Sequence, residues 1–328
     1  MKRSFCLLAF LLALLFLAPA LGSEAAADPV TITLVATCDL HGSIYSYDYA
    51  TDKETANTGL TRAASYIQEQ RAIDPELILI DNGDSIQANM ISLFNGDAVH
   101  PMINAFNLLD YQIWNLGNHE FNYDYSVLTR AISNFKGDVF LGNATNADGS
   151  GMKNTKPYTI FEVKGVKVGL FGATAPHIDR WESDPTHYNH MTFHAPMDQT
   201  EAMVKELRGQ VDVLIGLIHY GREGEYGTDG VNEIAAKFPE VDAYVAGHSH
   251  EVLNETLDNG VIIVEPGDKG QFVSKLTFTL EKSGDGFSIT EKAGDTVDMS
   301  NAVVSAISFN IMGLSKASSP PLRKYSRW

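Results

Sequence analysis

Residues 30–41 read VTITLVATCDLH, an apolar run that ends in two candidate metal ligands, Asp39 and His41. β-Branched residues dominate the run, which is typical of a buried strand. Four further apolar runs each stop at a polar cluster: residues 77–80 before DNGD, 111–116 before GNHE, 211–218 before His219, and 241–246 before GHSH. The sequence therefore predicts five strands that each end in a cluster of ionisable or amide side chains.

Helical patterns lie between several of these runs, at residues 60–70, 99–109, 126–135 and 200–209. Their apolar positions recur at three- and four-residue spacing, and the alternation with strands predicts an α/β fold. Further strand patterns follow one another without helices, at residues 159–163, 166–171, 260–264 and 272–280, and Lys164-Gly165 is typical of a hairpin turn. Two sheets packed face to face with helices outside would use all of these elements.

The polar clusters predict a metal site, because ligands bind at the carboxyl ends of strands in open α/β sheets. Strand alternation would direct Asp39 and His41 to one side, and likewise His248 and His250. The clusters combine carboxylates, imidazoles and an amide. Such a mixed set of nitrogen and oxygen ligands suits Zn, Mn, Fe or Co better than Ca or Mg.

Three other residues have distinct expected roles. The two carboxylate oxygens of Asp84 are able to bridge two ions, and the small Gly83 allows a sharp turn beside it. In GNHE, Asn118 offers an amide oxygen and His119 an imidazole able to donate a proton to a leaving group. His219 ends an apolar run that would bury it, so it needs a partner.

A single histidine in a sequence is more often structural than a metal ligand, and only the ordered set of clusters at strand ends changes that expectation. The remaining histidines lack this context and are interpreted as structural: His100, His177, His187, His190 and His194. Cys38 alternates away from Asp39 and is interpreted as a small buried residue.

The chain has 328 residues, of which 44% are hydrophobic, enough for one large domain or two small ones. Residues 1–27 resemble a signal peptide, with Lys2 and Arg3 before a short apolar run and small residues after it, and the sequence leaves cleavage after Gly22 or after Ala27 open. We expect one domain over residues 28–300 and a loose tail over 301–328. Residues 43–57 form a long polar and aromatic loop that is either a wall of the binding site or a solvated insertion.

The acidic composition restricts the possible partners. The chain carries 24 Lys and Arg against 41 Asp and Glu, a formal net charge of −17, which disfavours duplex nucleic acid and anionic membranes. A small phosphorylated substrate remains possible because bound cations reverse the local field. We expect a secreted protein without a stable membrane anchor, and nothing in the sequence indicates a protein partner. Loss of Cys6 with the signal peptide would leave Cys38 alone, without an internal disulfide.

The order DxH, GD, GNHE, H, GHxH resembles that of the calcineurin-like metallophosphoesterases, from residue 30 to about 280. The resemblance implies a four-layer α/β/β/α sandwich of two mixed sheets flanked by helices, and two divalent metal ions, whether Mn, Zn, Co or Fe. It implies that Asp39, His41 and His250 hold one ion and that Asn118, His219 and His248 hold the other. It further implies that Asp84 bridges the ions and that His119, with Asn118 beside it, acts in catalysis at the leaving-group side.

The segments DNGDSIQ at 81–87, HPMIN at 100–104 and NLGNHEFNY at 115–123 resemble secreted nucleotidases, closest to the 2',3'-cyclic-nucleotide 2'-phosphodiesterase/3'-nucleotidase branch. Asn122 stands where 5'-nucleotidases typically carry an aspartate that pairs with the catalytic histidine. Asp124 is therefore a candidate to orient His119, and Arg62, in GLTRAAS, is a further candidate supporting residue.

The resemblance is incomplete. These enzymes usually carry a C-terminal nucleotide-binding domain, and we expect no such domain among residues 28–328. Three functions therefore remain open at this point. The first is cyclic-nucleotide phosphodiesterase/3'-nucleotidase activity, the second is 5'-nucleotidase or UDP-sugar hydrolase activity, and the third is a non-catalytic truncated relative.

Overall fold

The computed structural model describes residues 28–302. The expected signal peptide and residues 303–328 of the expected tail lie outside the described residues. Within residues 28–302, none of the helices combines the length and apolarity needed to cross a membrane.

The first sheet has six strands in the order β16-β15-β1-β4-β5-β6. Its central strand β1 pairs in parallel with β4 and antiparallel with β15, so the sheet is mixed. The strands run over β1 Val30–Thr37, β4 Ile78–Asp81, β5 Ile113–Asn115, β6 Asp138–Phe140, β15 Phe272–Ser283 and β16 Gly286–Asp298.

The second sheet also has six strands, in the order β13-β14-β12-β11-β9-β8. Strands β9, β11, β12 and β14 are parallel neighbours, whereas β8 and β13 pair antiparallel at the two edges. The strands run over β8 Tyr158–Val163, β9 Val166–Thr174, β11 Val213–His219, β12 Ala243–Val245, β13 Val252–Thr256 and β14 Ile262–Pro266. Lys164 and Gly165, both with positive φ, turn the chain between β8 and β9 as the sequence predicts.

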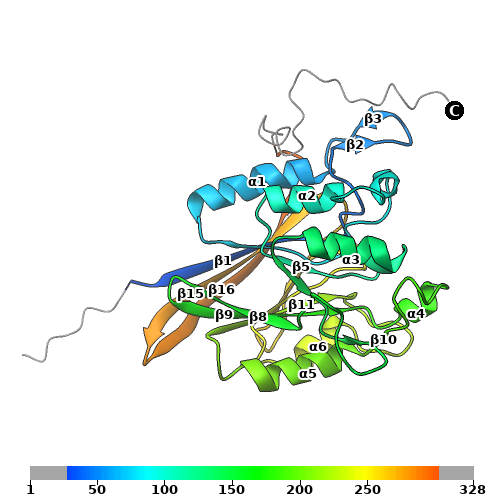
Figure 1. Ribbon diagram of the computed structural model, residues 1–328. Helices are drawn as coiled ribbons and strands as arrows, with labels where there is room; N and C mark the ends of the chain where they lie inside the picture. Colours follow the sequence, from blue (N-terminus) through cyan, green and yellow to red (C-terminus); the bar gives the residue numbers. More distant parts are fainter. Residues whose placement is uncertain (1–27, 303–328) are drawn as a thin grey trace, which may run out of the picture.

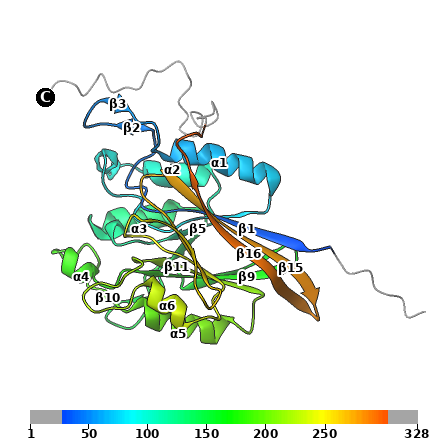
Figure 2. The ribbon, with the colours of Figure 1, turned by 180° about the vertical axis from the view of Figure 1, so that it is seen from behind.

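Helices cover the outer face of each sheet, which gives the four layers visible in Figures 1 and 2. One outer layer contains α1 Leu60–Ile73, α2 Pro101–Leu108 and α3 Tyr125–Asn134, and the other contains α5 Pro196–Leu207 and α6 Val231–Lys237. Three apolar clusters fill the spaces between the layers. Val35 belongs to the cluster between the first sheet and helices α1 to α3. Ile32 and Ile215 belong to the cluster between the two sheets, and Leu214 belongs to the cluster between the second sheet and helices α5 and α6. The α/β fold of two mixed sheets flanked by helices is confirmed.

Short elements complete the chain at the ends of the sheets. They are β2 Tyr47–Asp48, β3 Lys53–Glu54, η1 Ile91–Phe94, η2 His119–Phe121, β7 Ala144–Thr145, α4 Ile178–Trp181 and β10 Thr192–Phe193. The β2–β3 hairpin lies within the loop 43–57, and α4 lies beside the second sheet's loops (Figure 1). Most of these elements are too short to show a periodic apolar pattern.

Candidate metal centre

The candidate ligands lie in loops that follow the strands, and several of them have an unusual backbone conformation. Strand β1 ends at Thr37, and Asp39 and His41 have φ angles of 50° and 44°. His248 and His250 also have positive φ, at 74° and 57°. The expectation that strand alternation aligns each pair is therefore wrong, because these residues are not in extended backbone. Left-handed backbone is unfavourable for residues with a side chain and is maintained only where the surroundings impose it.

Hydrogen bonds between loops impose this conformation. The backbone N–H of Asp39 donates to the Gly83 carbonyl at 2.8 Å, and that of His41 donates to the Asp84 carbonyl at 2.9 Å. The N–H of His248 donates to the Asp39 carboxylate at 3.1 Å. The loops after β1, β4 and β12 thus position one another.

The first group of candidate ligands consists of Asp39, His41 and His250, whose ligand atoms all lie within 4.8 Å of one another. The Nε2 atoms of the two histidines are 2.9 Å apart, and His250 Nε2 is 3.4 Å from Asp39 Oδ1. His41 Nδ1 lies 3.1 Å from Gln87 Oε1, an acceptor. If Nδ1 donates this bond, Nε2 presents a lone pair to the group.

The second group consists of Asp84, His219 and His248, whose ligand atoms also lie within 4.8 Å of one another. His219 is fully buried at the end of β11, and its Nδ1 donates to the Asn82 carbonyl at 2.7 Å. Its Nε2 is 3.1 Å from Asp84 Oδ2. Asn118 joins this group, since its Oδ1 lies 2.8 Å from His248 Nδ1.

The two groups adjoin. Asp39 Oδ1 is 3.9 Å from His219 Nε2 and also belongs to the first group. All seven predicted ligands are thus gathered in one place, although β1, β4 and β5 belong to one sheet and β11 and β12 to the other.

In the second group, the buried His219 imidazole and the buried Asp84 carboxylate shift each other's pKa. Burial lowers the pKa of His219, but the Asp84 and Asp39 carboxylates outweigh burial and raise that pKa to about 10. Burial raises the pKa of Asp84, but the neighbouring imidazoles, chiefly His219, outweigh it and lower that pKa. The carboxylate and the imidazole compensate each other's charge.

The residues present fit two divalent cations. Asp84 Oδ2 and His219 Nε2 are buried and face each other at 3.1 Å, yet neither makes a hydrogen bond of good geometry among residues 28–302. Unpaired buried polar atoms are costly, and a cation between them would satisfy both. The donor set of imidazole nitrogens with carboxylate and amide oxygens is one that borderline transition metals accept.

Glu120 supports this centre, although its role was not predicted. Its buried carboxylate accepts from the backbone N–H groups of Asp84, Ser85 and Gly117 at 2.7 to 2.8 Å. It therefore fixes the turns that carry Asp84 and Asn118. The position of Glu120 in the GNHE motif is the sequence feature that could have identified it as part of the site.

Gly117 is required by close packing against Asp84. A Cβ atom at this position would lie 2.2 Å from Asp84 Oδ1 and 2.6 Å from the Asp84 backbone nitrogen. Only glycine allows the two loops to approach this closely.

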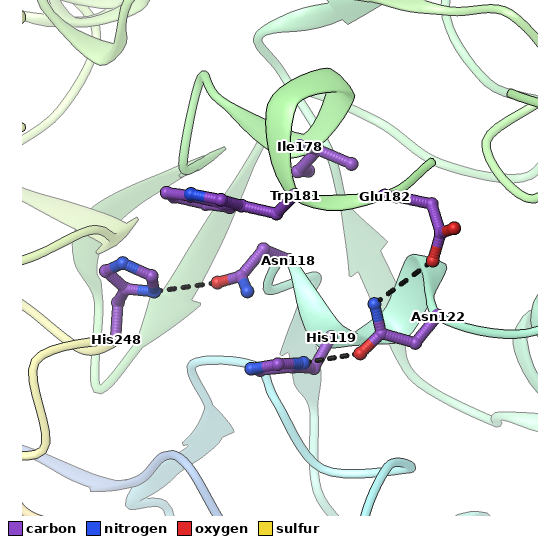
Figure 3. Close-up of a pocket in the computed structure, with 7 residues that line it drawn as sticks. All are labelled: Asn118, His119, Asn122, Ile178, Trp181, Glu182 and His248. Carbon is purple, nitrogen blue, oxygen red and sulfur yellow. Dashed lines mark hydrogen bonds between the residues drawn. The ribbon is translucent and has the colours of Figure 1, made fainter. Parts of the chain in front are cut away.

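His119 lies at the edge of the centre, and Asn122 is its partner. The Oδ1 atom of Asn122 is 2.5 Å from His119 Nδ1 (Figure 3). On the other side of the ring, His119 Nε2 is 4.0 Å from Asp84 Oδ2. Asp124 is exposed at the N-terminus of α3, so the hydrogen bond to His119 comes from Asn122 instead.

The Arg62 side chain donates to Ser46 Oγ and to the Ala302 and Thr55 carbonyls, which ties the loop 43–57 to α1.

A cavity of about 200 Å³ opens beside His119. Seven residues line it: Asn118, His119, Asn122, Ile178, Trp181, Glu182 and His248 (Figure 3). The Trp181 ring stacks on His248, with centroids 5.1 Å apart and planes 24° apart. The three residues from 178–182 were not predicted, because α4 is a single turn without a motif. None of the seven comes from the loop 43–57, which was expected to be either a wall of the site or a solvated insertion.

His100, His194 and Cys38 make contacts away from the two ligand groups. The buried His100 ring accepts a hydrogen bond from the Met102 backbone N–H at the start of α2. His194 lies on the surface, 2.9 Å from Thr145 Oγ1. Cys38 is buried and unpaired, with Sγ 3.5 Å from the Gly267 carbonyl, and burial raises its pKa well above the ordinary value.

A family model described as calcineurin-like phosphoesterase matches residues 32–252, which include the whole metal centre. The chain belongs to the calcineurin-like phosphoesterase family. Members of this family use a dinuclear metal centre, in agreement with the two ligand groups.

Curated relatives are named as nucleotide phosphoesterases. The chain is 30% identical to the trifunctional nucleotide phosphoesterase protein YfkN of Bacillus subtilis, over 88% of this chain and 22% of that protein. It is 31% identical to the 2',3'-cyclic-nucleotide 2'-phosphodiesterase/3'-nucleotidase of Haemophilus influenzae, over 68% of this chain and 37% of that protein. The chain therefore spans between about a fifth and about two fifths of these two family members.

Solved structures agree with this assignment. The crystal structure of calcineurin-like phosphoesterase YfkN from Bacillus subtilis superimposes with a TM-score of 0.78 at 28% identity, over 87% of this chain and 96% of that chain. A putative 5'-nucleotidase from Staphylococcus aureus shares the fold, with a TM-score of 0.73 at 23% identity, over 87% of this chain and 58% of that chain.

Proposed function

We propose that this chain hydrolyses phosphate esters of nucleotides and that two divalent metal ions take part. The observation that carries the proposal is the pair of adjoining ligand groups with His119 at their edge. The substrate class is supported by the relatives named as nucleotide phosphoesterases.

The proposed ligand assignment divides the seven residues between the two ions. Asp39, His41 and His250 would hold one ion, Asn118, His219 and His248 the other, and Asp84 would bridge them. When bound, the two ions would activate water and neutralise charge on the phosphate. The candidates are Mn, Zn, Co and Fe.

His119 is the proposed general acid. Its Nδ1 faces Asn122, and its Nε2 faces the centre, where the ester oxygen would leave. A protonated Nε2 would donate its proton to that oxygen and so avoid a strongly basic leaving group. Asn118, directly before it in the chain, would hold an ion and place His119 beside the phosphate.

The leaving nucleoside would occupy the cavity beside His119. The Trp181 ring and the Ile178 side chain provide apolar surface there, and the Glu182 carboxylate lies at its edge (Figure 3). This cavity lies within the proposed phosphoesterase domain, residues 28–300.

We further propose that the protein is secreted, on the basis of the signal-peptide pattern in residues 1–27.

We propose 2',3'-cyclic nucleotides and 3'-nucleotides as substrates. The second candidate is 5'-nucleotidase or UDP-sugar hydrolase activity, which is favoured by a 5'-nucleotidase of Diplobatis ommata at 30% identity over 69% of this chain. Asn122 favours the first candidate, since it replaces the aspartate typical of 5'-nucleotidases.

A substrate panel tests the proposal. Purified full-length protein with measured metal content is assayed against 2',3'-cyclic AMP, 3'-AMP, 5'-AMP and UDP-glucose. Preferred turnover of the first two is expected. Preference for 5'-AMP or UDP-glucose would support the second candidate. A lack of metal-dependent turnover of the panel and of bis(p-nitrophenyl) phosphate, with Mn, Co or Zn, would support a non-catalytic protein.

A further inference from the structure

Glu182 contacts the partner of His119 from a different part of the chain. Its Oε2 accepts a hydrogen bond from Asn122 Nδ2 at 3.4 Å, and Asn122 Oδ1 in turn lies 2.5 Å from His119 Nδ1 (Figure 3). The three side chains thus form a line that starts just after α4 and ends at the metal centre.

Glu182 is itself held in place. Its Oε1 accepts from the backbone N–H of Asp184 at 3.0 Å, and its Oε2 lies 3.3 Å from His187 Nδ1. The Glu182 side chain is only 12% exposed. Partial burial raises the pKa of its carboxyl, but the Asp184 N–H and the neighbouring His187 and Asn122 side chains outweigh burial and lower that pKa. Glu182 is therefore an ionised carboxylate, which accepts hydrogen bonds and donates none.

Because the Glu182 carboxylate only accepts hydrogen bonds, it determines which atom of the Asn122 amide faces it. The oxygen and nitrogen of an amide are nearly equal in size, so an amide without a directing neighbour can present either atom to a partner. A carboxylate attracts the NH₂ group and repels the oxygen. With its NH₂ group toward Glu182, Asn122 presents its oxygen to His119.

The orientation of the amide in turn decides where His119 keeps a proton. An oxygen at Nδ1 accepts the Nδ1 proton, so the protonated ring can give up the Nε2 proton and remain as the neutral Nδ1–H tautomer. In that transfer the P–O bond to the leaving oxygen breaks, its electron pair takes the proton to form an O–H bond, and the N–H bond at Nε2 breaks. An NH₂ group at Nδ1 would instead donate to a bare Nδ1 and would leave the proton on Nε2, which is the opposite tautomer.

We propose that Glu182 is a positioning residue that orients the Asn122 amide so that His119 holds a proton on Nδ1 and presents Nε2 to the leaving group. This inference rests on the proposed function. It assigns to an asparagine and a glutamate together the orienting role that a single aspartate would otherwise perform for a catalytic histidine.

A double-mutant cycle tests the proposal, with Glu182→Leu made in the wild-type and in the Asn122→Asp background. Leucine neither accepts nor donates, so it frees the amide of Asn122 to rotate. Both oxygens of an aspartate accept, so Asp at position 122 needs no orientation. Asp179→Leu is the matched control, because Asp179 is an exposed carboxylate on α4.

The readout is the ratio of turnover with 3'-AMP to turnover with bis(p-nitrophenyl) phosphate, because p-nitrophenolate leaves without needing a proton. Glu182→Leu is expected to lower this ratio about tenfold or more in the wild-type background. In the Asn122→Asp background the same change is expected to alter the ratio by less than about threefold. Equal loss with both substrates, or the same loss in both backgrounds, would overturn the proposal.

A spectroscopic measurement separates this proposal from the proposed function. Long-range ¹H–¹⁵N spectra of the Zn-loaded full-length protein are expected to show neutral His119 as the Nδ1–H tautomer, and Glu182→Leu is expected to shift it toward Nε2–H. An unchanged tautomer in the variant would overturn the orienting role. If the wild type hydrolyses neither substrate, the proposed function fails while the spectra still decide the role of Glu182.

Discussion

At the scale of single residues, His119 contacts the centre through its side chain without belonging to either ligand group. We predict that His119→Ala lowers turnover of 3'-AMP by roughly 10²- to 10⁴-fold, the usual contribution of a general acid. The bound metal, measured by elemental analysis of the same sample, should change far less. His194→Ala, which removes a surface imidazole, is the control. A parallel loss of metal and turnover in His119→Ala would make His119 a metal or structural residue.

Gly117 provides a second prediction at this scale. Its replacement by alanine would place a Cβ atom 2.2 Å from Asp84 Oδ1, so the Asp84 carboxylate has to move. We expect Gly117→Ala to lose most of its metal and its activity together. Gly151→Ala, at a position where a Cβ meets nothing within 4 Å, should retain both. Normal metal content in Gly117→Ala would show that the Asp84 position is not critical for binding.

The sequence predicted which residues gather at the centre but gave the wrong geometric reason for two pairs. The ligands could be found because each follows an apolar run, and this pattern can be recognised in the sequence without the structure. The positive φ angles of Asp39 and His248 could not be read from the sequence, since they result from hydrogen bonds between loops that are distant in the chain. Trp181 and Glu182 were missed for a related reason, as only the folded chain brings residues 178–182 next to His119.

At the scale of elements, the strands with apolar runs were predicted to within a few residues, whereas the 13-residue strand β16 was not singled out. This strand lies at the edge of the first sheet and pairs only with β15, so most of its side chains are partly or fully exposed and it lacks an apolar run. A turn signal was present, because Gly284-Asp285 connects Ser283 to Gly286 in a two-residue hairpin.

The start of α2 provides a prediction on pH. His100 accepts from the Met102 N–H through Nδ1, which requires a neutral ring, and burial together with Arg130 lowers its pKa to about 4. In the unfolded chain a histidine titrates near pH 6.5. Between these values the unfolded state binds the extra proton, so stability is complete above about pH 6.5 and is lost as the pH falls toward 4.

Replacing His100 with asparagine should remove this pH dependence while retaining a residue that caps helices. We expect the free energy of unfolding of the wild type to fall by about 2 to 3 kcal/mol more than that of His100→Asn between pH 7 and pH 4.5. Denaturant unfolding of both proteins in the presence of a chelator measures the difference without the metal contribution. Identical slopes against pH would show that His100 is not the group responsible.

At the scale of the whole molecule, the metal centre lies where the two sheets meet. The first ligand group combines Asp39 and His41, which follow β1, with His250, which follows β12 of the other sheet. The second combines Asp84, after β4, with His219, at the end of β11. Each ion would therefore connect loops that follow strands of the two different sheets. Binding energy at such a site is folding energy, because the unfolded chain has no preformed site.

Removal of the metal should therefore lower the melting temperature of the entire domain in a single cooperative transition. A ligand at one hundred times its dissociation constant adds about 2.7 kcal/mol, which corresponds to roughly 5 °C or more for a domain of this size. Calorimetry with and without EDTA measures the shift, and added Mn or Zn should reverse it. Asp84→Asn, which keeps the side-chain shape but lacks the bridging charge, should show a smaller shift. An EDTA shift as large in Asp84→Asn as in the wild type would mean that the stabilising ions bind elsewhere, and a separate early transition would mean that the centre stabilises only its own loops.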